Sequence, residues 1–177
     1  MMKIPLLSGL ALLSAIAGAQ AHGTPASPSI RALNFILGDW HGTQVFNAKL
    51  AGRPMSAKME LHAKRIIGDR YVEEQITATL PGRPPSDVRH LATFSTQANA
   101  LQSWWFDDAN VGPLAMTGNL DGKNVVLMSH PAEGSKAPVL RATYMPKSKT
   151  EFSFKLEMKM GPTWTELFVT DYQRDAG

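Results

Sequence analysis

The sequence predicts an all-β protein: an antiparallel up-and-down β-barrel of about ten strands, preceded by one short N-terminal helix. From Trp40 onward, apolar residues alternate with polar ones, as expected for strands that bury one face. Turn-forming residues interrupt this alternation at roughly ten-residue intervals. No later segment has the helical periodicity of a crossover connection, so consecutive strands are expected to be antiparallel neighbours. A two-sheet sandwich is the alternative.

The first 21 residues have the pattern of a secretory signal peptide. Lys3 precedes an apolar run over residues 4–17, and Ala19-Gln20-Ala21 forms an Ala-x-Ala cleavage pattern. The apolar run is too short to span a bilayer. We therefore expect cleavage after Ala21 and a periplasmic or secreted protein.

The composition excludes several classes of chemistry. The chain contains no cysteine, so disulfides, thiolate zinc sites, covalent c-type haem attachment and cysteine nucleophiles are excluded. Its formal net charge is only +3, and removal of Lys3 brings it closer to zero, which argues against nucleic acid as a partner. Stability must come from a packed core, which a domain of this length can form.

One short helix is predicted before the strands. Residues 22–29 are expected to be a flexible leader, and residues 30–177 a single barrel domain. Ser27 and Pro28 suit the N-cap and the first helical position, and Gly38 suits the end of the helix. The residues that recur at helical spacing between them are Ile30, Leu33, Asn34 and Leu37.

Ten strands are predicted, separated by segments rich in glycine, proline and aspartate. Residues 55–64 and 151–160 alternate most clearly, each with one apolar and one largely charged face. Because ten such strands would leave two exposed edges in an open sheet, closure into a barrel is favoured. The predicted ranges are 39–50, 55–67, 70–80, 87–95, 101–107, 112–119, 124–130, 139–145, 151–160 and 163–174.

The closure of the barrel is predicted to involve Gly38, Trp40 and Arg174. In an up-and-down barrel with an even number of strands, the first and last strands are antiparallel neighbours. The start of the first strand, at Trp40, then lies beside the end of the last strand, at Arg174. A guanidinium over an indole face forms a favourable cation–π pair, so these residues are expected to seal one end.

Four blocks of the sequence form a recognisable set: residues 33–42, residues 67–74, Trp104 to Asp107 before Gly118, and residues 166–174. Together they resemble the secreted bacterial family called domain of unknown function 1579, in the calycin (lipocalin-like) superfamily. This resemblance covers nearly the whole chain after the signal peptide and implies a fold, since the family has no assigned activity.

The motif Gly38 to Gly42 is also similar to the entry motif of nitrobindins, which are haem-binding calycins that ligate iron through a histidine near the C-terminus. Here the last histidine is His130, and the final two predicted strands contain none. Because of this departure from the nitrobindin pattern, no cofactor is predicted.

The ligand-binding candidates are apolar and aromatic residues on inward faces. Trp104 and Trp105 point to opposite faces of one strand, so one of the two lines the interior. Methionines on the apolar faces suit a cavity of irregular shape, and equally suit an irregular core. The predicted ligand-binding residues are Met59, Leu61, Trp104, Trp105, Tyr144, Phe154 and Met158.

His90 and Asp107 are the candidates for acid–base catalysis, if the protein is an enzyme. Glu73 and Glu166 are further carboxylates that burial would tune for proton transfer. The five histidines show no metal-ligand spacing, so no metal is predicted. Serine-nucleophile, phosphate-loop and dinucleotide-binding motifs are absent from the sequence.

The leading hypothesis is a non-catalytic protein that binds a small apolar or amphipathic molecule inside the barrel. The alternative is a cofactor-independent enzyme that isomerises, cyclises or decarboxylates its substrate with an interior acid or base. A haem-binding barrel and a structural module that binds a partner protein are less favoured.

Overall fold

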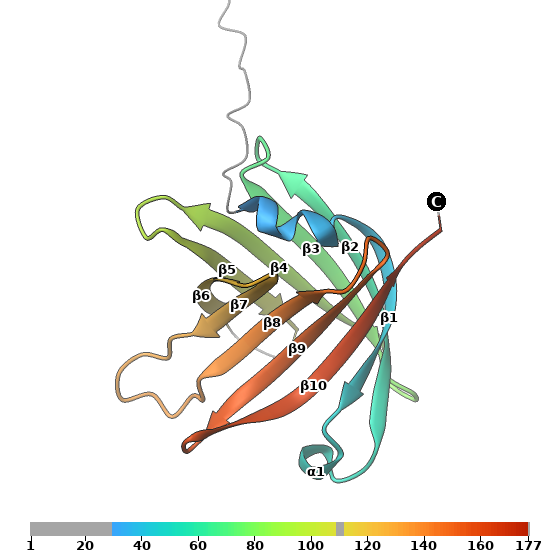
Figure 1. The fold of residues 1–177 in the computed structure, drawn as a ribbon. Helices are drawn as coiled ribbons and strands as arrows, with labels where there is room; N and C mark the ends of the chain where they lie inside the picture. The colour runs from blue at the N-terminus through green and yellow to red at the C-terminus, as the bar shows by residue number, and fades with distance from the viewer. Residues whose placement is uncertain (1–29, 109–111, 177) are drawn as a thin grey trace, which may run out of the picture.

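Ten antiparallel strands form a closed barrel in the computed structural model, which describes residues 30–108 and 112–176 (Figure 1). Each strand pairs with its neighbours in sequence, and β1 pairs with β10 to close the sheet. This confirms the predicted barrel and excludes the sandwich. The predicted signal peptide, the leader and the N-cap at Ser27 lie outside the described residues.

The strands begin and end within two residues of the predicted positions, except at the end of the first. The elements in chain order are η1 Ile30–Ile36, β1 Gly38–Phe46, α1 Ala48–Ala51, β2 Met55–Ile66, β3 Tyr71–Thr79, β4 Ser86–Ser95, β5 Ala100–Asp107, β6 Leu114–Asp121, β7 Asn124–Ser129, β8 Leu140–Pro146, β9 Glu151–Met160 and β10 Thr163–Arg174.

The predicted extension of the first strand to Leu50 is wrong. Strand β1 ends at Phe46, because Asn47 caps a four-residue helix, α1, whose Lys49 amide donates to the Asn47 side chain over 3.0 Å. Gly52, at a left-handed φ of 74°, ends α1 and turns the chain into β2. This helix lies at the end of the barrel opposite η1 (Figure 1).

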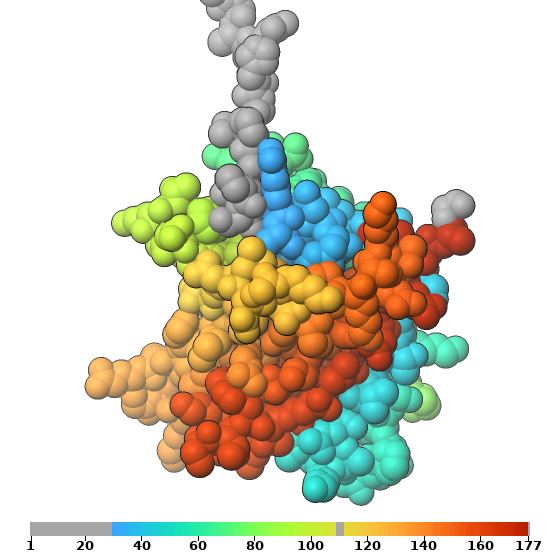
Figure 2. Space-filling model, viewed as in Figure 1, coloured from blue at the N-terminus to red at the C-terminus, as the bar shows by residue number. Residues whose placement is uncertain are grey.

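The N-terminal 3₁₀-helix η1 covers one end of the barrel. Its apolar residues Ile30, Leu33 and Ile36 are almost fully buried. In the space-filling view, η1 (blue) fills this end beside the β8–β9 connection (orange) (Figure 2). The predicted helix is therefore present, with the tighter 3₁₀ geometry common in short helices.

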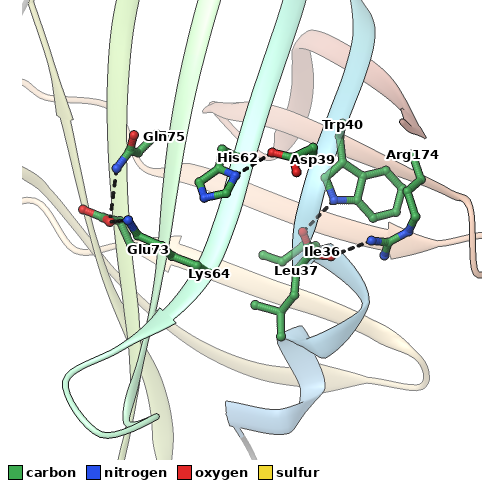
Figure 3. A network of polar contacts seen from close by, with 9 residues as sticks. All are labelled: Ile36, Leu37, Asp39, Trp40, His62, Lys64, Glu73, Gln75 and Arg174. Atoms are coloured by element: carbon green, nitrogen blue, oxygen red, sulfur yellow. Dashed lines mark hydrogen bonds and ion pairs between the residues drawn. The ribbon is translucent and has the colours of Figure 1, made fainter. Parts of the chain in front are cut away.

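Trp40 and Arg174 join η1 to the seam between β1 and β10 (Figure 3). The Trp40 indole donates from Nε1 to the carbonyl oxygen of Ile36 over 2.7 Å. The Arg174 guanidinium lies 4.1 Å from the centroid of the Trp40 ring, and its Nη1 donates to the carbonyl oxygen of Leu37 over 2.7 Å. Gly38 has a φ of 112°, which favours glycine, and a Cβ there would lie 2.5 Å from Arg174 Nη1.

The alternation of buried and exposed residues follows the two faces of the barrel wall. In β2, Ala57, Met59, Leu61 and Ala63 are buried, while the polar residues between them are exposed. The described residues include no helix with the length and apolar character needed to cross a membrane.

Candidate functional site

The centre of the barrel holds a cavity of about 250 Å³. Residues of β1 to β6 and β8 to β10 line it, so it lies inside the barrel wall and not on its surface. Most of its wall is apolar, with the flexible thioethers of Met59 and Met116 among the lining side chains. The aromatic lining residues are Trp105, Tyr144, Phe154, Phe168 and Tyr172. The non-aromatic polar lining residues are Gln44, Glu74, Asp107 and Thr170.

A buried polar cluster of Glu74, His90 and Tyr144 adjoins this cavity. All three side chains are at most 1% exposed. His90 Nδ1 lies 2.5 Å from Glu74 Oε1, and the Tyr144 hydroxyl donates to the same oxygen over 3.0 Å. The Tyr144 oxygen also lies 3.1 Å from His90 Nδ1, so the three groups form a closed triangle.

Strand register brings this cluster together. Glu74 on β3 is directly opposite His90 on β4, and His90 is directly opposite Trp105 on β5. All three side chains point inward, because directly opposite residues share one face of a sheet. Tyr144 reaches the pair from β8, far around the barrel.

Four buried polar atoms around the cluster have no hydrogen-bond partner among the described residues: Glu74 Oε2, His90 Nε2, Trp105 Nε1 and Ser103 Oγ. A buried polar atom without a partner costs about 1–3 kcal/mol. Because folded proteins rarely leave several such atoms together, their grouping in the barrel interior marks it as a candidate site.

Aromatic rings hold the cluster in place. The Trp105 ring stacks on His90 with 4.1 Å between centroids and 18° between planes. Phe154 packs against Tyr144 on one side and against Trp105 on the other, with centroids 4.8 Å and 5.4 Å apart. The side chains are therefore fixed before any ligand binds.

Burial sets the protonation of the two tyrosines in the wall. It raises the pKa of Tyr144 well above its ordinary value, and the nearby carboxylate of Glu74 raises it further. Burial, with a smaller effect of Glu74, also raises the pKa of Tyr172. Both hydroxyl groups therefore remain protonated hydrogen-bond donors at physiological pH.

The structure places the predicted ligand-binding residues in two groups. Met59, Leu61, Trp105, Tyr144 and Phe154 line the cavity. Trp104 lies on the opposite face of β5, because it is adjacent in sequence to the inward-facing Trp105. Met158, toward the end of β9, is also not among the lining residues.

The two predicted catalytic candidates differ in position. Asp107 lines the cavity at the end of β5. His90 is fully buried and is not among the lining residues. It is connected to the cavity through its contact with the Glu74 carboxylate.

Of the two further carboxylates, Glu73 is largely covered, with a side chain 12% exposed, but neither it nor Glu166 points into the barrel. The Glu73 side chain is on the outer face, where Arg89 Nη1 donates to it over 2.9 Å and Lys64 Nζ lies 3.5 Å away, and Glu166 is exposed. Glu74 is the candidate site residue missed from the sequence. It lies two residues from the apolar Val72 and two from Ile76, so it shares their inward face, and this was the available signal.

In the described part of the chain, no group of three or more histidine, aspartate or glutamate side chains is placed to hold a metal ion.

Comparison with known families identifies the chain. The model of the family described as "Protein of unknown function (DUF1579)" matches residues 26–174. The chain belongs to this family. No curated protein sequence matches this DUF1579 protein.

Two solved structures resemble the barrel of the DUF1579 protein. The S-type phycobiliprotein lyase CPES from Guillardia theta is similar with a TM-score of 0.60 and 6% identity, over 84% of this chain and 94% of that chain. A structure described as EF1p2_mFAP2b bound to DFHBI has a TM-score of 0.46 and 13% identity, over 83% and 99% of the two chains. At these identities the likeness to the lyase concerns the fold alone.

Proposed function

We propose that this DUF1579 protein binds a small apolar or amphipathic molecule inside its barrel. The observation that carries the proposal is the 250 Å³ cavity, lined by aromatic and thioether side chains with a few polar groups. Ligand sites in proteins combine these features: a mostly apolar wall with a small number of placed polar atoms.

Ligand binding in this cavity is expected to stabilise the protein. A molecule that binds the folded chain and not the unfolded chain raises the free energy of unfolding. We also propose that the protein acts in the periplasm or outside the cell, on the basis of the signal-peptide pattern alone.

Trp105 provides a direct measurement of binding. Titration with 3-phenylpropan-1-ol, a small amphipathic probe, is expected to give a saturable change in tryptophan fluorescence, because the Trp105 ring lines the cavity. The Trp105→Phe variant should lose most of this change. Trp164→Phe should keep it, because Trp164 stacks under Arg141 on the outer face. No saturable signal together with no heat in calorimetry would contradict the proposal.

A second candidate function is acid–base catalysis without a cofactor. The specific observation that favours it is the contact of Glu74 with both His90 and Tyr144 beside the cavity. In this mechanism Glu74 would accept a proton from a substrate carbon. The protonated Tyr144 hydroxyl would turn from Glu74 Oε1 to donate its hydrogen bond to the developing oxyanion. His90 would position the carboxylate.

Hydrogen–deuterium exchange tests this second function. In deuterated water, the protein is expected to speed exchange of the α-protons of 2-tetralone, an apolar ketone, measured by proton NMR. Glu74→Gln should reduce the protein-dependent rate about a hundredfold, the lower range for loss of a general base. Tyr144→Phe should also slow it. A rate that is unchanged in Glu74→Gln would exclude this mechanism.

A further inference from the structure

We propose that the cavity selects organic amines: small molecules with an apolar, aromatic body and one ammonium group that binds the Glu74 carboxylate. This proposal rests on the proposed binding function and adds the chemical class of the ligand.

The charges around the cavity point to a cationic ligand. Apart from tyrosines, the ionisable side chains that line it are Glu74 and Asp107, and both are acidic. Among the described residues, no lysine, arginine or histidine is part of the lining. A fatty acid or other carboxylate ligand would lose its hydration beside the acidic Glu74. His90 contacts Glu74 Oε1 but is not part of the lining, so among the described lining residues no cationic side chain meets such a ligand. An ammonium group meets the opposite charge instead.

The hydrogen bonds of Glu74 leave one oxygen for such a ligand. His90 and Tyr144 both contact Oε1, whereas Oε2 has no partner among the described residues. The Glu74 side chain is 1% exposed, so water outside the barrel does not solvate this oxygen. An ammonium group donates up to three hydrogen bonds and accepts none, which suits an unpartnered carboxylate oxygen.

The aromatic wall favours the same class of ligand. Trp105, Tyr144 and Tyr172 line the cavity together with Glu74. Electron-rich faces of tryptophan and tyrosine attract organic cations, and the attraction increases where water is excluded. The cavity, at about 250 Å³, exceeds the ~150 Å³ engineered cavity that holds benzene, so a body of one or two rings fits.

Three probes of similar shape test the proposal by isothermal titration calorimetry at neutral pH: 3-phenylpropan-1-amine, 3-phenylpropan-1-ol and 3-phenylpropanoate. We expect the amine to bind at least about tenfold more tightly than the alcohol, since the ammonium group adds the attraction between opposite charges to its hydrogen bond with Glu74. The carboxylate should bind most weakly. This order is measured on the unmodified protein and requires no variant to fold.

The Glu74→Gln variant removes the charge and keeps the shape and an acceptor oxygen for Tyr144. It should lose the preference for the amine, with at least about a tenfold drop in amine affinity and a smaller drop in alcohol affinity. Glu73→Gln is the matched control. It removes the same charge from the adjacent residue on the outer face, where Arg89 contacts it, and should preserve the preference.

The outcomes separate this proposal from the binding function. If the alcohol binds but the amine shows no preference over it, or the carboxylate binds as tightly as the amine, selection of amines is wrong and binding stands. An amine preference that survives in Glu74→Gln also overturns the assignment to Glu74. If none of the three probes binds, both proposals fail.

Discussion

Replacement of Gly118 by alanine is expected to cost at least about 3 kcal/mol of folding free energy, at the upper end of the usual cost of overpacking. Gly118 lies in the middle of β6, opposite Leu127 of β7. A Cβ at this position would lie 1.8 Å from the carbonyl oxygen of Val126 and 2.8 Å from the Cα of Leu127. Both contacts are with backbone atoms, so no side-chain rotation relieves them and the two strands must separate locally.

The measurement is the unfolding midpoint in urea and on heating, with a decrease in Tm of about 10 °C expected for a domain of this size. Gly112→Ala is the matched control. A Cβ at Gly112 meets no atom within 4 Å, so we expect its stability to stay within about 0.5 kcal/mol of the original protein. Equal stability of the two variants would show that β6 and β7 do not approach as closely as described.

Replacement of Arg174 by methionine is expected to destabilise the closed end by about 2–4 kcal/mol, because main-chain oxygens lose their donors. Arg174 donates to the carbonyl oxygens of Leu37 and Phe35 over 2.7 Å and 3.2 Å, and to that of Lys149 over 3.2 Å. It thus ties η1 and the β8–β9 connection to the end of β10. Methionine keeps much of the apolar contact with the Trp40 ring and removes these donors, so the variant isolates their contribution.

Arg141→Met is the control for this substitution. Arg141 also stacks on an indole, 4.3 Å from the centroid of the Trp164 ring, and donates from Nε to Glu157 over 2.8 Å. It lies on the outer face, and Lys155 remains 3.1 Å from Glu157, so a loss of about 1 kcal/mol or less is expected. Urea unfolding compares the two variants. If Arg141→Met lowers the free energy of unfolding as much as Arg174→Met does, the hydrogen bonds from Arg174 to main-chain carbonyls do not account for the stability of the closed end.

Hydrogen exchange locates the effect of Arg174→Met within the chain. The amides of η1 and of the start of β1 are expected to exchange faster in this variant, while those of β4 and β5 keep their protection. Uniform loss of protection across the barrel would instead show that the closed end has no separate role.

The alternation of residue types and the turn residues were sufficient to predict the ten strands, and the short connections predicted their antiparallel order. In β2 and β9, charged and apolar side chains alternate without interruption over most of the strand, so a shift by one residue would bury the charges. The end of β1 escaped prediction because the side chain of Asn47 competes with the sheet for backbone hydrogen bonds. No period in the sequence records that competition.

The candidate site was only partly predictable. The period of two placed Trp105 and Tyr144 on inward faces and separated Trp105 from Trp104 once the orientation of β5 was known. The same period assigns Glu74 to the inside with Val72 and Ile76, but only the register with the neighbouring strand shows that it lies opposite His90.

The sequence by itself determined the strand order, the inward faces of β2 and β9 and the pairing of Trp40 with Arg174, because these depend on local periodicity and on strand number. Only the tertiary structure decided that Glu74, His90 and Tyr144 meet, and that a cavity remains beside them. The physical reason is that strand register and tilt set the height of each side chain within a barrel, and the volumes of side chains from many strands together decide which space stays empty.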